Sequence, residues 1–430
     1  MRTMFISMVV ALCEVMTASA QIVSIEQCYK WAEENYPLTK RYDLISQTEG
    51  FTVENIKKGW LPQIEASLQG SYQSTVTELP DGLLNLMKQM GSDVKGISHA
   101  QYRAAIDVQQ TVYDGGAISA KKKLAERESK VKQASADVQM YQLHERVNNL
   151  FFGNLLLDKQ LELNEEKQRA ITSNLDRLEK MLKGGTAMQC DVDALNAELL
   201  LAKQQHTDIE AQRETFLKVL SLLTGHEIKG FLLMPALVNG NLNSESFQLR
   251  PEMRLFDSQL SLIDAKERML DVSVLPKVGL FAQGYYGYVG MNIFRDMMKR
   301  TPTLNGIVGV KAMWNISAFY THKNDRSKLA LDRQTVENDR DIFLFNQHLQ
   351  FQQEDRNISR YQKLINEDAN ICQLRHNVRV AAEEKLKAGI VDVNTLIEEI
   401  SNENRANINR AIHEIELKQH QYKSKTIKGE

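Results

Sequence analysis

The chain has 430 residues, with 53 basic and 55 acidic side chains and a formal net charge of −2. This balance excludes a strong electrostatic attraction to nucleic acid. After the extreme N-terminus no stretch of about 18 apolar residues occurs, which excludes a helical membrane span. It does not exclude a membrane β-barrel, because barrel strands alternate apolar and polar residues.

Residues 1–20 predict a secretory signal peptide. Arg2 supplies the positive start, residues 4–13 form a short apolar core, and Ala18 and Ala20 mark a small-residue cleavage site. The signal predicts export of the mature chain.

The mature chain retains three cysteines, Cys28, Cys190 and Cys372. Their odd number and wide spacing indicate neither a disulfide framework nor a zinc site. We interpret them as small residues on helices or near helix ends.

The first half of the mature chain combines two amphipathic strands with long helices. Ile64, Leu68 and Tyr72 alternate with polar residues, which is the period of a strand with one apolar face. The first repeat is predicted at 21–230, with strands 62–74 and 103–113, a long helix 117–183 and a helix 190–224.

Long helices are predicted because proline is absent from 81–234 and from 303–430. Each gap contains one helix stop, a lysine followed by glycine, at Gly185 and at Gly389. A helix of 65–70 residues is about 100 Å long, which an ordinary globular domain does not need. We therefore expect two antiparallel helical hairpins that span a distance far longer than a globular domain.

The second half repeats this order. Pro37 and Pro251 coincide at an offset of 214 residues, as do Tyr72 and Tyr286, whereas the glycine stops recur at an offset of 204. The second repeat is predicted at 231–430, with strands 276–288 and 306–316, a long helix 320–388 and a helix 392–424.

Four strands cannot close a barrel, and open strand edges in lipid leave backbone groups without hydrogen bonds. Several copies must therefore share one barrel. The predicted fold class is mainly α with a membrane β-barrel: two internal repeats, each with two barrel strands and a long helical hairpin. A trimer would have a 12-strand β-barrel continued by a periplasmic α-barrel.

Several short motifs, in this order, resemble the TolC family of outer-membrane efflux and secretion channels. The resemblance covers nearly the whole mature chain. Its motifs are Asn35-Tyr36-Pro37, Trp60-Leu61-Pro62, Val112-Tyr113-Asp114-Gly115-Gly116, Gly185 with Asp191-Val192, Arg250-Pro251-Glu252, Trp314-Asn315-Ile316 and Gly389.

The resemblance implies the outer-membrane channel subunit of a tripartite efflux or type I secretion system. It would be a passive trans-periplasmic duct in the outer membrane of a Gram-negative cell, extending into the periplasm. The implied partners are two further copies in a homotrimer, a periplasmic adaptor (membrane fusion protein), an inner-membrane pump and outer-membrane lipid, without nucleic acid. No cofactor and no catalytic activity are implied.

In the family, the duct is gated at its periplasmic tip, where acidic rings narrow the pore. The resemblance assigns this tip to Gly185, Asp191, Gly389, Asp392 and Glu398. The chain departs from the family where Thr395 replaces a frequent aspartate, six residues after the second glycine. The alternative for each carboxylate is a solvated residue at a helix N-terminus.

Two histidines and a basic cluster are further candidates for a metal or binding site. His413 and His420 lie seven apart, on one face of a predicted helix, and are interpreted as a solvated pair, not a metal site. The basic cluster of residues 121–123 is either a solvated helix start or a contact with lipid headgroups or lipopolysaccharide. The alternative function is a non-pore periplasmic coiled-coil adaptor or structural protein.

Overall fold

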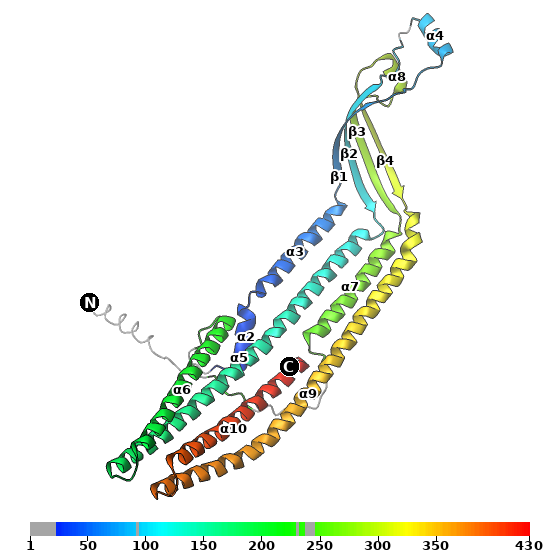
Figure 1. Ribbon diagram of the computed structural model, residues 1–430. Coiled ribbons are helices and arrows are strands. Elements are labelled where there is room, and N and C mark those ends of the chain that lie inside the picture. Colours follow the sequence, from blue (N-terminus) through cyan, green and yellow to red (C-terminus); the bar gives the residue numbers. More distant parts are fainter. Residues whose placement is uncertain (1–22, 92–93, 229–231, 237–245) are drawn as a thin grey trace, which may run out of the picture. The chain divides into compact units, whose positions relative to one another are not determined.

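The computed structural model describes residues 23–91, 94–228, 232–236 and 246–430, so the predicted signal peptide 1–20 lies outside the described residues. The chain is mostly helical, with one antiparallel sheet (Figure 1). The elements are α2 Ile25–Asn35, α3 Thr39–Lys57, β1 Gln63–Tyr72, α4 Asp81–Gln89, β2 Ala100–Tyr113, α5 Ala117–Lys183, α6 Gln189–Thr224, α7 Pro251–Ser273, β3 Lys277–Tyr288, α8 Ile293–Met298, β4 Thr303–Met313, α9 Phe319–Lys387 and α10 Val393–Lys428.

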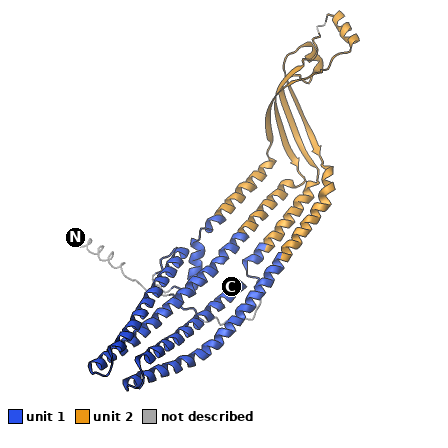
Figure 2. Ribbon diagram, viewed as in Figure 1, with its two compact units in different colours: residues 1–42, 134–255, 339–430 blue, residues 43–133, 256–338 orange. Residues whose placement is uncertain are grey.

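The chain forms two compact units, each built from both sequence halves (Figure 2). One unit, here the helical unit, comprises residues 1–42, 134–255 and 339–430. The other, here the sheet unit, comprises residues 43–133 and 256–338. The repeats therefore run along the chain, whereas each compact unit takes segments from both of them.

The sheet unit contains four antiparallel strands in the order β1-β2-β3-β4. The pairing is continuous: Leu68 faces Ala104, which in turn faces Tyr286. Because side chains alternate along each strand, this register gives the sheet two faces of different composition. The apolar face is exposed and includes Ile64, Leu68, Tyr72, Ile106, Leu280, Tyr286, Leu304, Val308 and Val310. The opposite, polar face includes Gln63, Glu65, Gln69, Arg103, Asp107, Gln109, Lys277, Gln283, Asn305 and Lys311.

The two strand hairpins have the same register. Gln63 faces Gln109 in the first hairpin, and Lys277 faces Met313 in the second. The first strands are thus related by an offset of 214 residues and the second strands by 204. These are the two offsets at which the sequence repeats its prolines and its glycine stops.

The strand bounds differ from the sequence prediction by up to three residues. β1 is Gln63–Tyr72 instead of 62–74, β2 begins at Ala100 instead of 103, and β4 begins at Thr303 instead of 306. The fourth strand ends at Met313, not at 316, because the Trp314 indole N–H donates to the Val274 carbonyl at 2.9 Å and residues Ile316–Ala318 form a 3-10 turn. The segment between β1 and β2 contains the short helix α4, and the segment between β3 and β4 contains α8.

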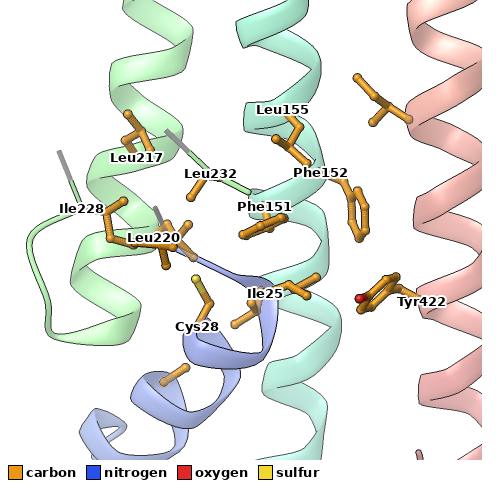
Figure 3. Close-up of a cluster of buried hydrophobic side chains, with 14 residues drawn as sticks. Ile25, Cys28, Phe151, Phe152, Leu155, Leu217, Leu220, Ile228, Leu232 and Tyr422 are labelled. Atoms are coloured by element: carbon orange, nitrogen blue, oxygen red, sulfur yellow. The ribbon is translucent and has the colours of Figure 1, made fainter. Parts of the chain in front are cut away.

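The helical unit has a core in which α2, α5, α6 and α10 meet (Figure 3). Phe151 and Phe152 of α5 are almost completely buried there, and Tyr422 of α10 packs against Phe152. The Tyr422 hydroxyl donates to Glu26 of α2 at 2.9 Å. Residues distant in sequence therefore share one core.

Helices α5 and α6 approach closely beside this core. A Cβ atom at Gly153 would lie 2.5 Å from Cε1 of Phe216, so only glycine leaves room for that ring. Throughout the part of the chain that the structure describes, no helix offers an 18-residue window apolar enough to cross a bilayer.

Candidate functional site

The two helical hairpins of the helical unit turn at glycines. After α5, Gly185 has φ +72°, and the Gly185 and Thr186 N–H groups donate to the carbonyls of Leu182 (3.0 Å) and Met181 (2.9 Å). These two bonds form the Schellman helix end, which requires a left-handed residue.

The second turn repeats the first. Gly389 has φ +70°, and its N–H donates to the Leu386 carbonyl at 3.0 Å. The N–H of Ile390 donates to the Lys385 carbonyl at 2.9 Å. Both glycines predicted at the tip therefore lie at hairpin turns, exposed to solvent.

The three predicted carboxylates lie on the helices that leave these turns. Asp191 is half-buried in the first turn of α6 and accepts a hydrogen bond from the Met188 N–H at 3.0 Å. Asp392 is the N-cap of α10 and accepts from the Thr395 N–H at 2.9 Å and from its hydroxyl at 2.6 Å. Hydrogen bonds from the Thr395 side chain and backbone lower the pKa of Asp392, so this exposed carboxyl is ionised at neutral pH.

Glu398 lies in the second turn of α10 and is exposed. Among the described residues it has no ion-pair partner, in contrast to its neighbour Glu399, which lies 3.5 Å from Arg375. Glu398 is therefore the least engaged of the three carboxylates.

An apolar cluster holds the two hairpins together next to the turns. Val192 and Val393, which follow Asp191 and Asp392 directly, belong to the same cluster. Four helices thus bring the two acidic helix starts into one region (Figure 1). The buried members are Ile171, Leu175, Leu178, Val192, Leu195, Ala202, Ala382, Val393, Leu396 and Ile400.

A polar contact crosses between the hairpins beside this cluster. The Asn174 amide of α5 donates to Glu383 of α9 at 3.1 Å. Glu383 also pairs with Arg379, whose guanidinium reaches Glu403 of α10. His376 lies 2.8 Å from the same Glu403. One chain of polar side chains therefore links α5, α9 and α10.

A second ion pair closes the first hairpin. Lys167 of α5 and Glu198 of α6 lie 2.7 Å apart, and their side chains are 10 % and 19 % exposed. None of these linking residues was predicted from the sequence. A signal existed for Asn174, because it lies three residues after Ile171 and directly before Leu175, so a polar side chain flanks the apolar seam.

The prediction that His413 and His420 form a solvated pair is wrong. Their side chains are 24 % and 16 % exposed, and each faces a buried carboxylate of α9. His413 lies 2.7 Å from Asp368, and His420 is hydrogen-bonded to Glu354. The common face that their seven-residue spacing gives them packs against α9 instead of facing water.

The family model for outer membrane efflux proteins matches residues 52–226. Solved structures share the fold over 94 % of this chain. They include VceC of Vibrio cholerae (TM-score 0.68, 11 % identity, 96 % of that chain covered), CmeC of Campylobacter jejuni (0.66, 12 %, 85 %) and MtrE of Neisseria gonorrhoeae (0.65, 12 %, 88 %). A comparison with curated protein sequences gave no match. The predicted resemblance is confirmed, and the predicted outer-membrane localisation agrees with these channels.

Proposed function

We propose that this chain, which matches the outer membrane efflux proteins over residues 52–226 and has the fold of solved outer-membrane channels, is one subunit of a homotrimeric channel. The channel would be a passive trans-periplasmic duct of a tripartite efflux or type I secretion system. A periplasmic adaptor and an inner-membrane pump would supply cargo and energy.

The observation that carries this proposal is the exposed apolar face of the sheet. Leu68, Leu304 and Val308 on this face are 87 %, 81 % and 80 % exposed. Exposed apolar surface on this scale calls for a partner or a lipid phase. Lipid suits it, because outward apolar and inward polar residues alternate in membrane barrels.

The strand edges support the trimer. In the four-stranded sheet β1 and β4 are the edge strands, and within the described chain each pairs on one side only. Backbone groups left unpaired in lipid cost several kcal/mol each. Pairing β4 of one copy with β1 of the next satisfies both edges, and three copies close a barrel of twelve strands.

We propose that the hairpin turns form the gate of this duct. The Asn174–Glu383 contact ties the two hairpins of one subunit, and the similar MtrE structure is described as an open state. Three copies would surround the pore with Asp191, Asp392 and Glu398. Ionised carboxylates around a narrow, poorly solvated pore favour cations.

The purified protein tests the channel itself. We expect a trimer that resists dissociation in detergent without heating and that produces discrete conductance steps in planar lipid bilayers. A soluble monomer without conductance would contradict the proposal and favour the periplasmic adaptor or structural protein.

The combined variant Asp191→Asn, Asp392→Asn and Glu398→Gln tests the gate. Asparagine still accepts the capping hydrogen bonds, so the helix starts persist while the charges disappear. Bilayer recordings should show higher conductance and weaker cation preference. Glu34→Gln, which neutralises an exposed carboxylate of α2, is the control. If the combined variant conducts like the control, these carboxylates do not form the gate.

A further inference from the structure

The sheet unit contains a cavity of about 670 Å³ where β2, β3 and β4 meet the start of α5. Its volume lies in the range of sites for drug-sized molecules. Lys121 of α5, Lys277 of β3 and Lys311 of β4 contribute to its lining, together with Phe281 and Met313.

The strand register places Lys277, Phe281, Lys311 and Met313 on the polar face of the sheet. Leu280 and Val310, which also line the cavity, lie on the opposite face. Lys311 pairs with Gly279, and Lys277 pairs with Met313. Phe281 follows Gly279 on the same face and pairs with Gly309. If the apolar face meets lipid, as the proposed function requires, this face borders the lumen through which cargo passes.

The three lysines supply positive charge that the protein does not neutralise. All three are exposed, and none has a carboxylate partner among the described residues. In contrast, Lys122 pairs with Glu126. The basic cluster of residues 121–123 therefore contributes Lys121 to the cavity and is not uniformly a solvated helix start.

The two acidic residues of the cavity are already engaged. Asp114 is 5 % exposed, and its oxygens accept from the N–H groups of Gly116 (2.8 Å) and Ile118 (2.6 Å) at the start of α5. Asp107 accepts from the Gln283 amide at 2.6 Å. Three free ammonium groups against two hydrogen-bonded carboxylates leave the cavity net positive.

Phe281 gives the cavity an aromatic surface. A Cβ atom at Gly309 would lie 2.7 Å from Cε1 of Phe281, so the ring covers the space that glycine leaves open. The cavity thus combines an apolar surface with ammonium groups, which matches a molecule that has an apolar body and an anionic group.

We propose that this cavity is a transit site for small organic anions with an apolar or aromatic body. The inference rests on the proposed function, because only a lumen-facing cavity meets cargo. When such a molecule passes the sheet, the three lysines and Phe281 would retain it transiently.

Purified trimer and the anionic aromatic probe 8-anilinonaphthalene-1-sulfonate test the proposal, with binding measured by calorimetry. Lys277→Gln and Lys311→Gln should each weaken binding about three- to fivefold, and the triple variant with Lys121→Gln at least about tenfold. Phe281→Leu should weaken binding without changing the charge. Lys122→Gln, the matched control, should bind like the unaltered protein.

Unchanged binding in the triple variant, equal loss in Lys122→Gln, or equally tight binding of the cationic dye rhodamine 6G would overturn the proposal. Every variant is first checked for trimers and for conductance. An unaltered protein that forms no conducting trimer contradicts the proposed function, whereas conducting trimers with lysine-independent binding contradict only the transit site. Each single lysine variant gives an independent readout if the triple variant does not assemble.

Discussion

Glu354 shows how single side chains fix the second helical hairpin. Its side chain is 4 % exposed on α9 and lies 3.1 Å from the Lys423 ammonium of α10. Burial alone would raise the pKa of this carboxyl, but hydrogen bonds from His420 and Lys423 outweigh burial and lower it. The ionised form therefore stabilises the contact between α9 and α10.

The variant Glu354→Gln should lower the free energy of unfolding at neutral pH by about 1–2 kcal/mol, because Lys423 loses its charged partner. The folded-state pKa of Glu354 lies below the ordinary value of 4.5. Its stabilisation is therefore complete above pH 4.5 and disappears as the pH falls through the folded-state pKa. The difference between the two proteins should shrink over the same pH range.

Chemical unfolding in detergent, followed by circular dichroism at several pH values, measures this difference. The control is Glu416→Gln, because Glu416 flanks the same His420 at 3.4 Å but is 35 % exposed and lies on the same helix. It should change the unfolding free energy by only a few tenths of a kcal/mol. A difference for Glu354→Gln that does not depend on pH would contradict the assignment.

The positions of several polar side chains could be predicted from the sequence, but the residues that they contact could not. Asp191 and Asp392 follow a helix stop closely, so their place near helix starts could be predicted from local chemistry. His413 and His420 meet carboxylates 45 and 66 residues away. Such contacts depend on which helix faces which, and helical periodicity alone does not determine that.

At the scale of elements, α5 and α6 pack closely because Gly153 carries no side chain. Gly153→Ala should destabilise the protein by about 1 kcal/mol, because the clash with Phe216 exceeds the better helix propensity of alanine. Gly50→Ala on α3 is the matched control. A Cβ atom at Gly50 would meet nothing within 4 Å. The free energy of unfolding of this variant should therefore rise by about 0.5–1 kcal/mol.

The unfolding free energies of both variants can be measured under one detergent condition. We expect the unfolding free energy to fall in Gly153→Ala and to rise in Gly50→Ala. If both variants gain stability, the close approach of Phe216 to Gly153 does not exist in the folded protein.

The two longest helices could be predicted closely because proline and glycine are local signals. The sequence placed the long helices at 117–183 and 320–388, and the structure has Ala117–Lys183 and Phe319–Lys387. The fourth strand was harder to place, since Trp314 continues the apolar pattern although its indole is held by a carbonyl outside the sheet. The short helices α4 and α8 were not predicted from the sequence.

At the scale of the whole molecule, repetition was the most informative signal. The offsets of 214 and 204 residues reappear as identical registers in the two strand hairpins. Pairing of β2 with β3, which joins the two repeats into one sheet, could not be read from the repeats themselves. Nor could the division into two compact units, because each is assembled from both halves of the chain.

The shared core of α2 and α10 has a consequence for biogenesis. The Tyr422 hydroxyl donates to Glu26 across 396 positions of sequence, and the Tyr422 ring packs against Phe152 of α5. Contacts of such long range form slowly, since the intervening chain must first be closed into a loop. A nascent polypeptide that emerges from its N-terminus cannot complete this core until nearly the last helix has been made. We therefore expect the chain to travel to its destination unfolded and to depend on holding chaperones along the way.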